Sequence, residues 1–107
     1  MPLCIHGHFY QPPREDPISN YIPDERGAEP FHNWNEKILA ECYAPNAKVG
    51  NFGKISFNVG PTLFDWMWDY AADVAENIVE QERVNYLKFG VGNGMVQGYN
   101  HSILPLL

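Results

Sequence analysis

The chain has 107 residues, a hydrophobic fraction of 45% and a formal net charge of −6. These values are typical of one globular domain and not of a disordered segment. The acidic excess argues against nucleic acid and against an anionic membrane surface as partners, because both require a basic face. No stretch approaches the roughly 20 apolar residues of a membrane span and no leader opens the chain, so we expect a cytoplasmic protein.

The first predicted strand lies in the opening dozen residues. Residues 3–5 form a short apolar run that predicts a buried strand, in which Cys4 would be a small buried hydrophobe. His6 and His8 follow on alternate positions, which a strand sends to one face. The pair Pro12-Pro13 then ends the strand. We therefore expect two imidazoles at the carboxyl end of a strand, where parallel α/β folds place their ligand sites.

A long loop, a helix and a second strand are predicted next. Residues 14–30 are polar and rich in turn-forming residues, and loops of this length are usually functional or mobile. In this loop Arg14 is expected to be a solvated charge. Residues 31–43 carry apolar side chains at helical spacing, and Pro45 is expected to stop that helix. Residues 54–59 alternate apolar and polar side chains, as a half-buried strand does.

Two helical stretches follow the second strand. Residues 63–70 and 71–87 carry apolar side chains at helical spacing. Thr62 is a plausible cap for the first of them, because its hydroxyl can accept from the first turn. Glu82 is expected on the solvated face of the second.

The last part of the chain is glycine-rich and then apolar. Residues 90–94 contain three glycines but lack the spacing of a phosphate-binding fingerprint. Residues 95–99 resemble a third strand, so the order β-α-β-α-β predicts an α/β fold with a parallel sheet and right-handed crossovers. Three strands leave sheet edges uncovered. We therefore expect residues 1–107 to begin a longer α/β protein and to self-associate through the exposed edge.

The histidines are the strongest candidates for chemistry. His6, His8 and His101 could meet at one end of the sheet if the first and third strands are neighbours. Three imidazoles could hold zinc, although no metal-binding spacing accompanies them. Each could equally be a hydrogen-bonded structural residue. Hydrolysis of a sugar needs two carboxylates across the scissile bond, and none of the 13 acidic residues falls at a predicted strand end.

Four segments resemble, in the same order, the family 57 glycoside hydrolases, in the subgroup described as α-amylase-like. They are residues 6–17 (HGHFYQPPREDP), 30–38 (PFHNWNEKI), 55–63 (ISFNVGPTL) and 92–106 (GNGMVQGYNHSILPL). The resemblance implies an incomplete (β/α)7 barrel, of which residues 1–107 would be the N-terminal part. It also implies a retaining glycoside hydrolase or transglycosidase that acts on α-glucans or oligosaccharides, without a metal or other cofactor.

The same resemblance assigns residue roles. His8 and His101 would bind the sugar at the cleavage point, with His6 as the alternative alignment of the first motif. Gln11 would lie close by, and Tyr10 supplies a ring face beside it. In that family the nucleophile is a glutamate and the acid/base an aspartate. Both belong to later motifs, so no catalytic residue is assigned here and the 107 residues alone are expected to be inactive.

Two alternatives remain from the sequence. One is a metal-dependent deacetylase or mannosidase-like barrel with zinc on His6, His8 and His101. The other is a non-catalytic module whose histidines are structural.

Overall fold

A two-stranded parallel sheet lies at the centre of the structure, a computed structural model that describes residues 2–99 and 101. Strand β1 spans His6–Phe9 and strand β2 spans Ser56–Val59. Their register pairs His6 with Ser56 and His8 with Asn58. The two strands run parallel, which confirms the prediction of a parallel pair. A long helical crossover joins them, as such a pair requires.

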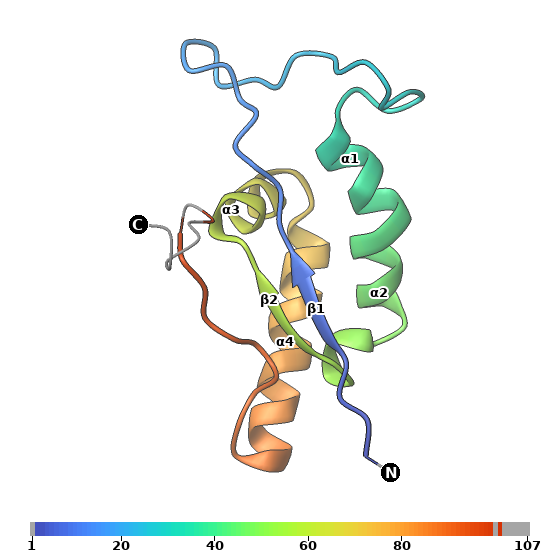
Figure 1. Cartoon of the computed structure of the whole chain (residues 1–107), viewed down its shortest axis with the longest axis vertical. Helices are drawn as coiled ribbons and strands as arrows, with labels where there is room; N and C mark the ends of the chain where they lie inside the picture. The colour runs from blue at the N-terminus through green and yellow to red at the C-terminus, as the bar shows by residue number, and fades with distance from the viewer. Residues whose placement is uncertain (1, 100, 102–107) are drawn as a thin grey trace.

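The crossover is one nearly continuous helical run (Figure 1). It consists of α1 over Trp34–Ile38, a π-helical turn η1 over Leu39–Tyr43, and α2 over Ala44–Lys48. The side chain of Asn33 caps its start by accepting from the Glu36 N–H at 2.9 Å.

The prediction that Pro45 stops this helix is wrong. The wider π-helical turn ends at Tyr43, two residues before Pro45, which then occupies the first turn of α2. At that position the missing N–H and the fixed φ of proline cost little. The amide of Asn46 also donates to the Cys42 carbonyl at 2.7 Å and so gives that group a partner.

A 3₁₀ turn η2 over Asn51–Gly53 leads into β2, and two helices follow that strand. Helix α3 spans Pro61–Tyr70 and α4 spans Ala72–Phe89, close to the predicted bounds. Thr62 does not cap α3. Its hydroxyl donates instead to the Gln11 carbonyl at 2.6 Å, which ties the segment after β1 to the start of α3.

The hydrophobic core lies between the sheet and the helices, and α4 runs behind the two strands in the view of Figure 1. Burial of these side chains is the main favourable term that holds the layers together. None of the helices in the described part of the chain has the length and apolar content to cross a membrane. The larger buried core side chains are those of Tyr43, Phe52, Phe57, Leu63, Trp66, Met67 and Ile78.

The prediction of a third strand at residues 95–99 is wrong. The segment meets β2 in a single parallel bridge between Phe57 and Gly94, in which the Met95 N–H donates to the Phe57 carbonyl at 2.7 Å. Val96 beyond it is 99% exposed. A strand needs a packed face as well as a partner, and the apolar residues after Gly94 lack that face within the described residues.

The prediction for Glu82 is also wrong, because its carboxylate is not simply solvated. It accepts from the Asn93 N–H at 2.6 Å and from the Gly94 N–H. The glycine-rich loop is thus fastened to α4, and its backbone donors bind a carboxylate of the chain itself.

The apolar run at residues 3–5 does not form a buried strand, and this expectation is corrected as well. Leu3 is 85% exposed, Ile5 is 57% exposed, and Cys4 is an exposed free thiol. The ladder begins only at His6, and the core packs against Phe9 at the other end of β1. The run therefore extends past the region that the helices cover.

Candidate functional site

Two histidines that are 93 positions apart in the sequence meet at the carboxyl end of the sheet. His8 Nε2 lies 3.0 Å from His101 Nε2. The ring centres are 5.1 Å apart and the planes differ by 15°. With that centre separation and so short a nitrogen contact, the rings meet edge to edge. The prediction that these two imidazoles lie side by side is confirmed.

The hydrogen bonds of the pair fix the positions of its protons. His8 Nδ1 lies 2.6 Å from Asn58 Oδ1, on the neighbouring strand. An amide oxygen only accepts, so Nδ1 carries the proton, and the neutral imidazole has a lone pair at Nε2. With His8 in this neutral tautomer, the His101 Nε2–H donates to His8 Nε2. The pair offers one donor and one acceptor that face each other.

This arrangement is complementary to a hydroxyl group. A hydroxyl that enters between the two rings can replace their mutual hydrogen bond, because one oxygen can accept from one imidazole and donate to the other. Both histidines are exposed, so a ligand can reach them from solvent. A sugar carries several such hydroxyls, and an ammonium or a carboxylate satisfies only one of the two roles.

Tyr10 completes an aromatic cluster with the pair. Its ring centre lies 3.9 Å from that of His101, with planes that differ by 15°. The distance to the His8 ring centre is 6.4 Å. Tyr10 therefore stacks on one of the two imidazoles and lies beside the predicted sugar contacts.

His6 has a different partner. Its Nδ1 lies 2.6 Å from the Ser56 hydroxyl, two ladder pairs before His8 and Asn58. Across residues 2–99 and 101, no three His, Cys, Asp or Glu side chains form a group that could hold a metal ion. The zinc set of His6, His8 and His101, which the sequence left open, is therefore not assembled.

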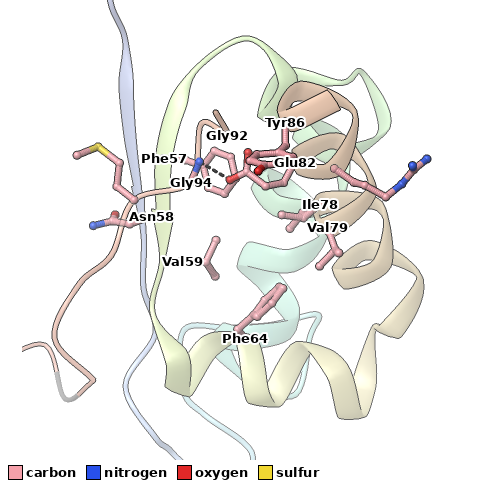
Figure 2. A pocket seen from close by; sticks show the side chains of 12 residues that line it. Phe57, Asn58, Val59, Phe64, Ile78, Val79, Glu82, Tyr86, Gly92 and Gly94 are labelled. Atoms are coloured by element: carbon pink, nitrogen blue, oxygen red, sulfur yellow. Dashed lines mark hydrogen bonds between the residues drawn. The ribbon is translucent and has the colours of Figure 1, made fainter. Parts of the chain in front are cut away.

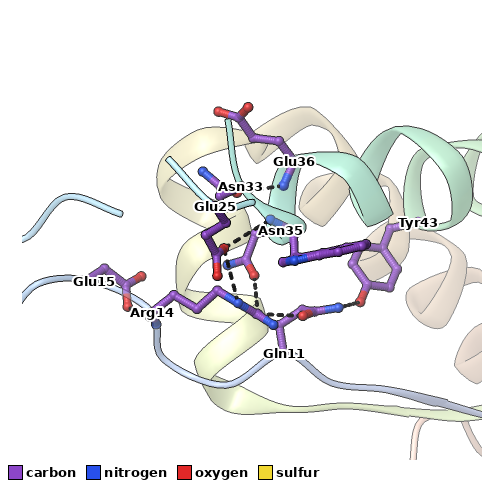
Figure 3. A network of polar contacts seen from close by, with 9 residues as sticks. Gln11, Arg14, Glu15, Glu25, Asn33, Asn35, Glu36 and Tyr43 are labelled. Atoms are coloured by element: carbon purple, nitrogen blue, oxygen red, sulfur yellow. Dashed lines mark hydrogen bonds and ion pairs between the residues drawn. The ribbon is translucent and has the colours of Figure 1, made fainter. Parts of the chain in front are cut away.

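Gln11 belongs to a separate polar network (Figure 3). Its amide nitrogen donates to the Tyr43 hydroxyl at 2.9 Å, and its oxygen accepts from Arg14 Nη1 at 2.6 Å. Burial raises the pKa of the Tyr43 phenol, which stays neutral and able to accept. Both ends of the Gln11 amide are engaged in this network, and its place beside the sugar stays a prediction.

Arg14 is the centre of that network, although the sequence predicts it as a solvated charge. Its side chain is 20% exposed and forms an ion pair with Glu25 at 3.3 Å. Its Nη1 also donates at 2.8 Å to the amide oxygen of Asn35, which is 2% exposed. Figure 3 shows Arg14 reaching from the segment after β1 to the start of α1. The network fixes the long loop that follows the strand.

An apolar groove lies between β2 and α4 (Figure 2). It has a volume of about 610 Å³ and is lined mainly by apolar side chains from β2, α3 and α4. Beside the Tyr86 hydroxyl, its polar side chains are bonded: Asn58 to His8, Glu82 to the glycine-rich loop, and Arg83 to Glu80. The groove thus offers few free polar groups to orient a sugar, and the histidine pair is the better candidate.

Asn58 is the site residue that sequence reasoning missed. It alternates with Phe57 and Val59 along β2, which is consistent with a solvated strand face. Only the register of β1 and β2, which the alternation does not specify, places it opposite His8. Comparisons with protein-family models, curated proteins and solved structures yield no match for this chain.

Proposed function

We propose that this chain forms part of the sugar-binding site of a retaining glycoside hydrolase or transglycosidase that acts on α-glucans. The observation that carries the proposal is the contact at 3.0 Å between His8 and His101. A hydroxyl that enters between the rings would engage the donor and the acceptor of this contact, which lies at the carboxyl end of β1. That is the end of the sheet at which parallel α/β enzymes bind their ligands.

The arrangement of the chain supports a barrel as the larger fold. β1 and β2 are parallel and joined by a helical crossover, and the segment at Gly94 bridges β2 in the same direction. A (β/α) barrel repeats this unit around a closed sheet. We propose that residues 1–107 correspond to the N-terminal part of such a barrel of the family 57 type.

The site as described binds and does not cleave. Retaining cleavage needs two carboxyl groups about 5 Å apart across the glycosidic bond. The family resemblance places that pair in motifs other than the four found here. We therefore propose two properties of residues 1–107. They bind an α-glucan through the histidine pair, and they do not turn it over.

The binding part is tested by NMR titration of the 107-residue chain with maltoheptaose, observing the imidazole signals. The signals of His8 and His101 are expected to shift with saturation. His101→Ala is expected to weaken binding about 2- to 10-fold, the range for one lost hydrogen bond. His32→Ala is the matched control, because the His32 side chain is 75% exposed and faces Asp24.

Two results would contradict the proposal. Imidazole signals that do not respond to maltoheptaose would remove the sugar site, and so would equal affinity for the chain and for His101→Ala. The second property is checked with soluble starch and a reducing-sugar assay. Turnover by the 107-residue chain would show that its own residues supply the carboxylates.

A further inference from the structure

We propose that Tyr10 is a positioning residue that holds the His101 imidazole against His8. Gly60 supplies the space that the Tyr10 ring needs for this. The inference rests on the proposed function, and it adds a mechanism by which two distant segments are aligned. The sequence predicts Tyr10 as a sugar contact. Here Tyr10 instead supports His101, which is the sugar contact.

The orientation of the three rings supports this role. Tyr10 and His101 are stacked with centres 3.9 Å apart, and Tyr10 and His8 differ in plane by only 13°. The three rings therefore share nearly one orientation. An imidazole stacked at this distance cannot turn out of its plane without losing the contact, and its Nε2 stays directed at His8.

His101 needs such a support because regular structure does not provide one. It lies outside the helices and strands, and its φ of 57° is in the left-handed region that residues other than glycine rarely adopt. The contacts of its side chain must therefore help to hold it. The stack on Tyr10 and the hydrogen bond to His8 are two such contacts.

Gly60 is suited to its position by space and not by backbone conformation. Its φ of −60° and ψ of 136° are open to any residue. A Cβ at Gly60, however, would lie 2.8 Å from Tyr10 Cδ2 and 3.2 Å from the Gln97 amide nitrogen. Contacts below 3 Å require the ring to move. The absence of a side chain at Gly60 is what lets Tyr10 lie where it stacks on His101.

The first test uses the ligand-free chain and two substitutions of Tyr10. Tyr10→Phe keeps the ring and is expected to preserve the ¹⁵N signals of the imidazoles and the Nε2–H signal of His101. Tyr10→Leu removes the stack and is expected to shift these signals. Tyr86→Leu is the control, since Tyr86 is 62% exposed on α4. Unchanged imidazole signals in a folded Tyr10→Leu chain would overturn the proposal.

The second test is a double-mutant cycle with Gly60→Ala. The added methyl group is expected to shift the same imidazole signals in the wild-type background and to have no such effect in the Tyr10→Leu background. The cycle also removes any cost of alanine at the cap position of α3, because that cost is common to both backgrounds. Equal shifts in both backgrounds would show that Gly60 does not act through Tyr10.

Sugar affinity separates this inference from the proposed function. If both hold, Tyr10→Leu weakens maltoheptaose binding roughly 2- to 10-fold, the range for the loss of one aromatic pair. Tyr10→Phe is expected to bind as the wild type does. If the wild type binds no sugar while the ligand-free signals respond as expected, the function fails and the positioning role stands. If sugar binds and Tyr10→Leu changes neither readout, the positioning role fails.

Discussion

Removal of the Glu82 carboxylate tests how the glycine-rich loop is held against the sheet. Glu82 accepts from the backbone N–H groups of Asn93 and Gly94, and a Cβ at Gly92 or Gly94 would collide with its carboxylate. The loop therefore closes around this side chain. Glu82→Ala leaves two backbone donors without their charged acceptor.

The magnitude follows from these two bonds. A hydrogen bond to a charged group contributes about 1.5–3 kcal/mol when water cannot replace it. Gly94 is exposed and Asn93 is partly exposed, so water recovers part of the loss. We expect Glu82→Ala to lower the free energy of unfolding by about 1–3 kcal/mol, a large share of the roughly 5–15 kcal/mol of a typical domain.

Urea denaturation measures this change, and amide hydrogen exchange locates it. Exchange is expected to accelerate most at the Met95 N–H, which bonds to Phe57 across the single bridge. Glu80→Ala is the matched control, because Glu80 lies on the same helix and forms only an exposed ion pair with Arg83. Equal midpoints for the two variants would refute the anchoring role of Glu82.

Three further predictions concern the rest of the structure. Arg14→Ala is expected to destabilise the chain by about 1–3 kcal/mol, because it leaves the buried Asn35 amide oxygen unpaired. Thermal denaturation measures this, with Arg26→Ala as the control because Arg26 is exposed. Burial raises the pKa of Tyr43, so its contribution to stability is fully present below the unfolded pKa of about 10 and is lost as pH rises through the higher folded pKa. Alkaline denaturation of Tyr43→Phe should lack this component, and a profile identical to the wild type would contradict it. Leu3 and Ile5 are exposed beside the edge of β1, so we expect the chain to self-associate there and Ile5→Lys to abolish the association. Sedimentation velocity at several concentrations tests this.

Local patterns were enough to predict the second strand and the helices that follow it. The alternation of apolar and polar residues located β2, and helical spacing located α3 and α4 within a few residues. These signals are local because each depends on which face of one element is buried. The same reasoning failed at Pro45, where a π-helical turn accommodates a residue that local rules treat as a stop.

The candidate site was predicted in part. The alternation of His6 and His8 and the order of the strands placed imidazoles at one end of the sheet. Two partners were not predictable in this way. Asn58 pairs with His8 only through the register of β1 and β2, and Arg14 is drawn from a polar loop onto Asn35 and Glu25.

The sequence by itself thus determined the helices, the two strands and their parallel order, since short-range periodicity encodes them. Only the tertiary structure decided which side chains meet. It brought His101 to His8, gave His6 and Gln11 hydrogen-bond partners of their own, and joined Glu82 to the glycine-rich loop. It also left residues 95–99 without a ladder. The physical reason is that hydrogen bonds between distant residues depend on register and loop closure, which no local pattern specifies.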